Sequence, residues 1–265
     1  MTAWGSQLTL IAELAAVTFL LGLLIGFIGA GGAGVAVAIL TALFAVPVHT
    51  AIGTAIVAML FVTLSGAISH VREGNVDLQL GLVVGLAGAA GAVVGAGFSQ
   101  TLSDRTLGIA AGIALWTLAL LVWIRLRITA RRDLPTDVDW HNGMQRPGAE
   151  WAKGVGIGVS GGAAAALFGV GMAPYLQLGF LTVHRLPLRQ TVGTTMLTLV
   201  FISASGGIAM ARHGDVSPPH LIGLTAGLAS GAYLGARFTK RAPKEILRGA
   251  VVVVPFVAGA MLLFR

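Results

Sequence analysis

Two stretches of this chain, 140 residues apart, share one pattern of small and apolar residues. The first reads GTAIVAMLFVTLSGAISHVREGNVD at Gly53–Asp77, and the second reads GTTMLTLVFISASGGIAMARHGDVS at Gly193–Ser217. Nine of the 25 aligned positions are identical, with no gap between the two copies. Self-similarity at a fixed offset is the signature of an internal repeat. The chain is therefore expected to contain two copies of one structural unit.

The register of this repeat extends well beyond the two stretches. Upstream it pairs Pro47 with Pro187, and downstream it aligns GAVVGAGF at 91–98 with GAYLGARF at 231–238. Each copy contains five apolar segments in the same order. These segments are Leu8–Ile28, Val35–Val46, Ala51–Ser69, Leu78–Phe98 and Leu107–Ile124 in the first copy, and Gly154–Phe168, Met172–Val183, Val192–Met210, Leu221–Ala236 and Gly249–Phe264 in the second. We expect a first repeat over residues 1–124, a cytoplasmic polar loop over 125–153 and a second repeat over 154–265.

The composition places these segments in a membrane. Of the 265 residues, 56% are hydrophobic and 10% are charged, with a mean hydropathy of +0.89. A soluble enzyme, a disordered chain or a disulfide scaffold does not have such a composition. There is no cysteine, which excludes thiolate catalysis and cysteine-bound metal centres. Since the segments are apolar all round rather than alternating, they are expected to be helices of an all-α polytopic membrane protein.

The second apolar segment of each repeat is short. A dozen residues make about 18 Å of helix, whereas the hydrocarbon core of a bilayer is about 30 Å thick. The segment follows GAGGAG at Gly29–Gly34 in one repeat and GVGMAP at Gly169–Pro174 in the other. Irregular backbone at membrane depth occurs only where protein or a wet cavity covers it. We therefore predict that the first two segments of each repeat form a hairpin with a glycine-rich tip inside the protein.

The basic residues predict the orientation. The net charge is +7, but the basic residues lie in short loops between apolar runs, so they indicate topology rather than nucleic-acid binding. With each hairpin returning to its starting side, 14 of the 17 basic residues share one face, and only Arg105, Arg212 and Arg265 lie on the other. The positive-inside rule then puts both termini outside. Ten full crossings give the same division, and in both cases the two repeats are inverted.

Inverted repeats with short, glycine-interrupted segments are typical of transporters whose substrate site lies where the repeats meet. A helix N-terminus attracts anions through its free N–H groups and its dipole. Hydroxyls that recur in register, including the pair Thr63 and Ser203, are candidates for a polar lining. The predicted substrate-binding residues are Gly29, Gly31, Gly32, Gly34, Thr54, Ser65, Gly169, Gly171, Met172, Thr194 and Ser205. The expected ligand is a small anion, with no metal, cofactor or catalytic residue.

The charged residues near the apolar segments and the recurring hydroxyl residues have two interpretations each. Arg72 and Arg212 end equivalent helices, where they either contact the membrane interface or attract the anion into a vestibule. Glu13 is the acidic residue inside an apolar segment, and it is either interfacial or a candidate for proton coupling. The hydroxyl residues can equally bond helix backbone. The repeated glycines outside the tips are expected to serve close helix packing; these are Gly85, Gly88, Gly91, Gly95 and Gly231.

The ordered, duplicated motifs resemble one known family. GFIGAGGAG at Gly26–Gly34, Gly53-Thr54 and SGAISHVREGNVD at Ser65–Asp77 recur as FGVGMAP, Gly193-Thr194 and SGGIAMARHGDV in the second half. Over nearly the whole chain this arrangement resembles the TauE/SafE sulfite exporter family. The resemblance implies a permease of the bacterial or archaeal cytoplasmic membrane that carries sulfite or related organosulfur anions. Alternating access between inverted repeats would then move the anion, with the membrane potential favouring export.

Two functions of other classes are also considered. Gly158-Val159-Ser160-Gly161 spells the GxSG of rhomboid-type serine proteases, so Ser160 is the candidate nucleophile of an intramembrane hydrolase. Such a serine needs a base within hydrogen-bond reach, and the histidines lie at segment ends. A non-transporting membrane partner, docking through the loop 125–153, is the other alternative. The lipid bilayer is the expected surrounding of all three, and a homo-oligomer is left open.

Overall fold

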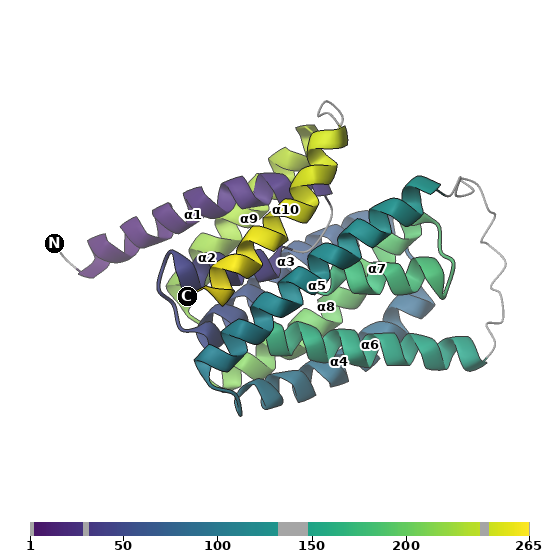
Figure 1. The fold of residues 1–265 in the computed structure, drawn as a ribbon, viewed down its shortest axis with the longest axis horizontal. Coiled ribbons are helices and arrows are strands. Elements are labelled where there is room, and N and C mark those ends of the chain that lie inside the picture. The colour runs from purple at the N-terminus through teal and green to yellow at the C-terminus, as the bar shows by residue number, and fades with distance from the viewer. Residues whose placement is uncertain (1–2, 29–31, 132–147, 239–243, 265) are drawn as a thin grey trace.

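The computed structural model describes residues 3–28, 32–131, 148–238 and 244–264. Within these ranges every secondary-structure element is a helix, which confirms the all-α prediction (Figure 1). The helices are α1 (Ala3–Ile28), α2 (Ala33–Ala42), α3 (Val48–Arg72), α4 (Leu78–Ser99), α5 (Asp104–Arg131), α6 (Gly148–Phe168), α7 (Ala173–Thr182), α8 (Leu188–Arg212), α9 (Pro218–Phe238) and α10 (Lys244–Leu263).

The helix boundaries follow the sequence repeat. Helices α2 and α7 begin 140 residues apart, at Ala33 and Ala173, and the same offset separates the starts of α3 and α8, of α4 and α9, and of α5 and α10. Residues with positive φ recur with this offset as well, as the pairs Ala45 and Arg185, and Gly74 and Gly214. The duplication therefore extends from the sequence to the backbone conformation of the turns.

The helix lengths divide the chain into spanning and short elements. Among the residues whose placement the structure describes, four stretches are long and apolar enough to cross a membrane: α3, α4, residues Asp104–Ile124 of α5, and α8. Helices α2 and α7 have only 10 residues each, about 15 Å of helix. This confirms the prediction of a short second segment in each repeat. The protein is thus an all-α, multi-pass membrane protein.

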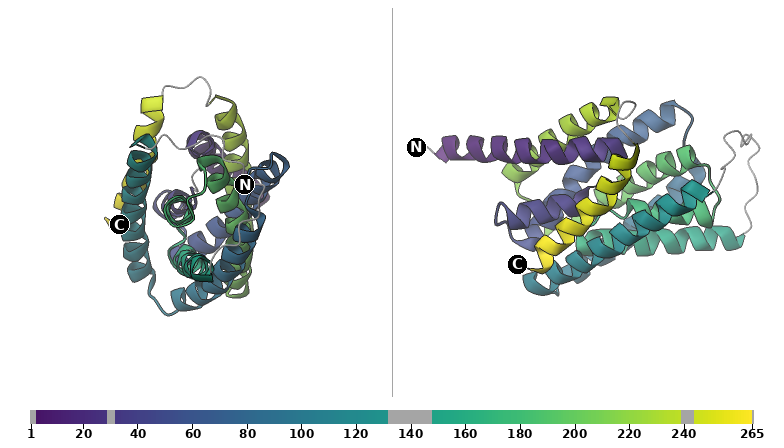
Figure 2. Two further views of the ribbon diagram at one scale, coloured as in Figure 1. Left: turned by 90° about the vertical axis from the view of Figure 1, so that its right-hand side faces the viewer. Right: turned by 45° about the horizontal axis from the view of Figure 1, so that its top comes forward.

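Each repeat packs its first helix against the fourth helix of the other repeat. Helix α1 lies beside α9 at one edge of the molecule, and α4 lies beside α6 at the opposite edge, with α3 and α8 between them (Figure 1). The short helices α2 and α7 lie between the α3–α8 pair and the α5–α10 pair (Figure 2). This exchange of partners makes the two repeats one interlocked body rather than two adjacent bundles.

The contacts of individual residues give the helix directions. Gly66 on α3 faces Met196 on α8, and Val57 faces Gly207, so these equivalent helices run antiparallel. In the α5–α10 pair, Gly112 faces Leu263, whereas Trp116 stacks on Phe256 and donates an indole hydrogen bond of 3.0 Å to its carbonyl oxygen. These two equivalent helices are therefore antiparallel too. Helices α4 and α6 are parallel, because Gly91 lies against Val159 and Gly95 lies against Ala163.

Glycines bring α4 and α6 into backbone contact. A Cβ added at Gly91 or Gly95 would overlap the carbonyl oxygen of Val159 or Ala163 on α6. A Cβ added at Gly162 would likewise overlap the carbonyl oxygen of Gly88 on α4. Small residues at such interfaces let membrane helices approach closely, where van der Waals packing holds them together. The prediction that the glycines outside the tips serve packing is confirmed, including Gly85 against Phe201 and Gly231 against the backbone of α1.

Replacing Gly162 with alanine tests this contact. The added methyl would overlap the Gly88 carbonyl, so Gly162→Ala should destabilise the protein by about 1–3 kcal/mol. The matched control is Gly156→Ala in the same helix, where an added Cβ meets nothing within 4 Å and should stabilise by about 0.5–1 kcal/mol. Thermal unfolding of the purified protein in detergent measures both. A Gly162→Ala variant as stable as wild type would contradict the close contact.

Candidate functional site

The second glycine-rich tip is a buried connection between α6 and α7. It comprises Gly169 to Met172, all of which are buried. Gly169 has a φ of +64°, a conformation that side chains rarely adopt, and an added Cβ would lie 2.7 Å from Ile52 Cγ1. Glycine is required there for both reasons. Gly169 and Gly171 therefore bring peptide groups into the centre of the protein without side chains of their own to cover them.

Backbone N–H groups at the N-terminus of α7 have no hydrogen-bond acceptor among the described residues. Its N-cap, Met172, makes no side-chain hydrogen bond to the helix, and no hydrogen bond between described residues uses the N–H groups of Val170, Gly171 or Met172. Gly32, the N-cap of α2, likewise provides no side-chain cap. Aligned peptide dipoles give each helix N-terminus roughly half a positive charge. Two helix N-termini without a side-chain cap among the described residues thus occupy equivalent places in the two repeats.

These two helix starts lie against each other. A Cβ added at Gly34 on α2 would lie 3.1 Å from a methyl group of Val170, and one added at Gly171 would lie 3.6 Å from Cβ of Ala33. Gly29 and Gly31 of the first tip fall outside the described residues. The observed contact is therefore between the second tip and the first turn of α2, and it brings the glycine-rich motifs of both repeats together.

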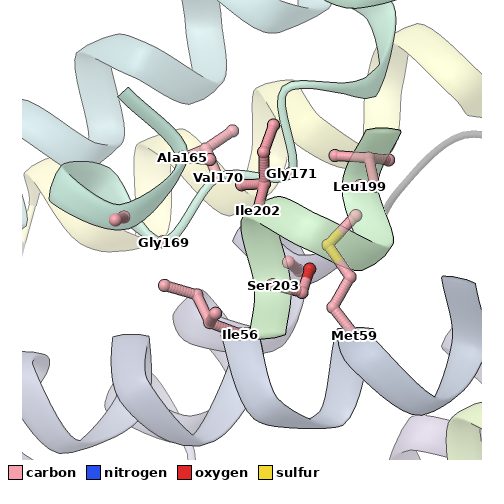
Figure 3. Close-up of a pocket in the computed structure, with 11 residues that line it drawn as sticks. Ile56, Met59, Ala165, Gly169, Val170, Gly171, Leu199, Ile202 and Ser203 are labelled. Carbon is pink, nitrogen blue, oxygen red and sulfur yellow. The ribbon is translucent and has the colours of Figure 1, made fainter. Parts of the chain in front are cut away.

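A small central cavity lies beside this contact. Its volume is about 10 Å³, room for one water molecule. Figure 3 shows the extended tip above Ile56 and Met59 of α3, with Leu199, Ile202 and Ser203 of α8 next to it. Ala33, Ala165 and Ala166 complete the lining with the three tip residues Gly169, Val170 and Gly171. Within the described part of the chain, the lining contains no charged side chain, and Ser203 is its one polar side chain.

Ser203 differs from its counterpart in the first repeat. It is 2% exposed, and its hydroxyl makes no hydrogen bond with the residues that the structure describes. Thr63, the equivalent residue, donates instead to the carbonyl oxygen of Met59 at 2.9 Å. The Ser203 hydroxyl is therefore available to a molecule in the cavity, as the sequence analysis considered for this pair.

Gln177 is a buried polar residue that the sequence analysis missed. It lies on α7, one turn after the tip, with an exposure of 0%. Neither its amide nitrogen nor its amide oxygen has a hydrogen-bond partner within the described chain. Helical side chains lean toward the N-terminus, which here is the tip. The sequence does contain one signal for this residue. The repeat pairs Gln177 with the apolar Val37 of α2, so an amide at this position departs from the repeated pattern.

The unpartnered amide should lower stability. Leaving a buried polar group unsatisfied costs about 1–3 kcal/mol, so Gln177→Leu, which removes the polar atoms and keeps similar bulk, is expected to stabilise the protein by that amount. The thermal midpoint in detergent would rise accordingly. Gln177→Glu should have the opposite effect, because it buries a charge. A lower midpoint for Gln177→Leu would show that the amide has a structural partner.

Two predicted binding residues, Thr54 and Thr194, connect the repeats. Thr54 Oγ1 accepts a hydrogen bond of 3.1 Å from the N–H of Ser217, and Thr194 Oγ1 accepts one of 3.0 Å from the N–H of Asp77. Each therefore holds the turn that follows the third helix of the other repeat. The preceding glycine permits this close approach, because an added Cβ at Gly193 would overlap the Asn75 carbonyl.

The remaining predicted residues lie away from the cavity lining. Ser65 is exposed on α3, while Ser205 donates to the carbonyl oxygen of Ala89 at 2.8 Å. Met172 lines a separate apolar cavity of about 360 Å³ against α5. Arg72 and Arg212 are exposed at the C-terminal ends of the antiparallel helices α3 and α8, and Glu13 is exposed on α1. The structure thus places these three charges on the surface.

The candidate nucleophile Ser160 has structural partners. Its hydroxyl donates to the carbonyl oxygen of Gly156 at 2.7 Å and lies 2.8 Å from the hydroxyl of Tyr175. Bonding to the carbonyl one turn earlier is the common arrangement of serine in a helix. Among the described residues no histidine bonds to Ser160, so the base that a hydrolase requires is not in contact with it.

Known proteins resemble this chain over nearly its whole length. The family profile described as "Sulfite exporter TauE/SafE" matches residues 14–262. The chain belongs to the TauE/SafE family. It is 39% identical over 248 residues to the "Probable membrane transporter protein YdhB" of Bacillus subtilis, covering 94% of this chain and 98% of that protein. A "Probable membrane transporter protein" of Xylella fastidiosa is 25% identical, with coverage of 93% and 92%. No solved structure matches.

Family and fold agree on the general class. A TauE/SafE profile over nearly the whole chain, together with long apolar helices, describes a membrane transporter. Its relatives carry the same general description, including the "Probable membrane transporter protein YunE" of Bacillus subtilis, which is 24% identical with coverage of 82% of this chain and 81% of that protein. The family resemblance seen in the sequence is confirmed.

Proposed function

We propose that this TauE/SafE protein is a secondary transporter that exports sulfite or a related small organosulfur oxyanion across the cytoplasmic membrane. The observation that carries the proposal is the meeting of two uncapped short-helix N-termini beside a buried, uncharged cavity. Such termini present N–H donors and positive dipole ends to an anion. The hydroxyl of Ser203 adds a donor from α8. The anion is expected to bind there.

The cavity volume supports alternating access. At about 10 Å³ it has room for one water molecule, which is less than a sulfur oxyanion needs. Transport therefore requires the tip to separate from α3 and α8, opening the site to one face at a time. Transporters with repeated units achieve this by moving one unit against the other around a central site. The membrane potential favours outward movement of an anion by about 2.3 kcal/mol per charge per 100 mV.

We further propose that the two repeats cross the membrane in opposite directions, with both termini outside. The antiparallel packing of equivalent helices, α3 with α8 and α5 with α10, supports this orientation, as does the positive-inside rule. The absence of native cysteine makes the topology easy to test. Exposed, equivalent residues follow α3 and α8, namely Glu73 and His213.

Cysteine labelling should separate these two equivalent positions. A membrane-impermeant maleimide added to intact cells is expected to label His213→Cys but not Glu73→Cys, and to label both after permeabilisation. The two residues lie at opposite ends of the antiparallel α3–α8 pair, which accounts for the difference. Labelling of both from outside in intact cells would rule out inverted repeats.

Counterflow in proteoliposomes tests the transport site. Purified protein should exchange radiolabelled sulfite, and Ser203→Ala should reduce this exchange about tenfold or more, because a hydrogen bond to a charged group contributes about 1.5–3 kcal/mol. Gly171→Leu should abolish it, since the side chain would fill the cavity against Met59. The control Ser230→Ala removes an exposed hydroxyl that bonds its own helix and should leave exchange unchanged.

Two outcomes would overturn this proposal. The first is that wild-type protein exchanges no sulfur oxyanion, with sulfite, thiosulfate, sulfate and sulfonates all tested. The second is full exchange by correctly folded Gly171→Leu protein, which would place the substrate away from the central cavity. Size-exclusion chromatography and thermal unfolding establish that each variant is folded before its transport is measured.

A further inference from the structure

We propose that the central cavity selects singly charged oxyanions, hydrogensulfite or a sulfonate, over the doubly charged sulfite and sulfate. This inference rests on the proposed transport function and specifies the charge of its substrate. The described elements around the cavity are the second tip, α2, α3, α6 and α8, and none of their described residues contributes a titratable side chain to the lining. An anion in the cavity therefore meets neutral groups alone.

None of the basic side chains that the structure describes lines the cavity. Arg72 and Arg212 are exposed as the last residues of α3 and α8, and Arg105 is exposed in the first turn of α5. Transfer of an ion from water into a protein interior is costly, and in the Born description the cost rises with the square of the charge. A second negative charge without a cationic partner would thus be far more costly than the first.

The helix N-termini match one charge. Each supplies the equivalent of roughly half an elementary charge, so α2 and α7 together offer roughly one. Their starts are in contact beside the cavity, since Ala33 of α2 lines it together with Gly171. This charge offsets a monoanion and leaves the second charge of a dianion uncompensated. The dipoles of the two equivalent helices thus set the preferred valence of the substrate.

The unpartnered side chains are neutral as well. The Ser203 hydroxyl lines the cavity and can both donate and accept a hydrogen bond. Gln177, buried on α7 behind the tip, carries an amide that is also both donor and acceptor. A protonated oxyanion such as hydrogensulfite offers acceptor oxygens and one O–H donor. This hydrogen-bonding pattern complements neutral groups better than that of a bare dianion, which only accepts.

Exchange at symmetric pH tests the charge preference. Proteoliposomes with equal internal and external pH are loaded with methanesulfonate, sulfate or sulfite and assayed below and above the second ionisation of sulfurous acid. Methanesulfonate, a monoanion throughout, should exchange at the same rate at every pH and so controls for titration of the protein. Sulfite exchange should fall about tenfold per pH unit above that ionisation, following the fraction of hydrogensulfite. Sulfate should exchange no faster than in protein-free vesicles.

A charge-adding variant provides a second test. Met59 lines the cavity and touches the tip at Gly171, so Met59→Lys places a cation there at similar side-chain length. The ratio of sulfate to methanesulfonate exchange is expected to rise at least tenfold in Met59→Lys, and to stay unchanged in the neutral control Met59→Gln.

The outcomes distinguish this inference from the transport function. Sulfate exchange as fast as methanesulfonate exchange in wild type, or sulfite exchange that is constant or rises with pH, would overturn the charge preference while leaving transport intact. A complete lack of exchange with all three anions would overturn both.

Discussion

Unpaired main-chain groups cannot face lipid, and this constraint organises the whole molecule. Helices α2 and α7 are too short to span a bilayer, and the N–H groups of Val170, Gly171 and Met172 in the second tip make no hydrogen bond with other described residues. In hydrocarbon each unsatisfied group would cost several kcal/mol. The short helices are therefore enclosed by long ones, with α3 and α8 on one side and α5 and α10 on the other. The unpaired peptide groups are thereby held at the centre of the protein, away from lipid.

The enclosure depends on exchange between the repeats. Each first helix packs on a fourth helix from the other copy, and glycines such as Gly91 and Gly162 allow backbones to touch. Thr54 and Thr194 add hydrogen bonds from the third helix of one repeat to a turn of the other. Neither repeat alone could cover its own short helix, because α2 packs on α10 as well as on α3, and α7 packs on α5 as well as on α8.

The fold is nearly symmetric, but the chemistry of its centre is not. Unpartnered polar side chains occur in the second repeat, at Ser203 and Gln177, where the first repeat has a backbone-bonded Thr63 and an apolar Val37. Duplication thus gives the scaffold, and divergence at a few positions gives the groups that we propose to bind the substrate. A site without fixed charges suits a transporter in which the substrate must leave as readily as it enters, since weak dipolar contacts can be exchanged for water.

Sequence alone determined the all-α membrane class, the five-segment repeat, the short second helices and the family, because apolar length and a fixed offset are properties of the chain itself. It identified the glycine-rich tips but did not separate Thr54 and Thr194, which bond the opposite repeat, from Ser203, which lines the cavity. It also passed over Gln177, whose one signal in the sequence is its difference from the apolar Val37 at the equivalent position. Only the tertiary structure decided these roles: whether a hydroxyl bonds a neighbouring backbone or faces a cavity depends on which helices, distant in sequence, are packed against it.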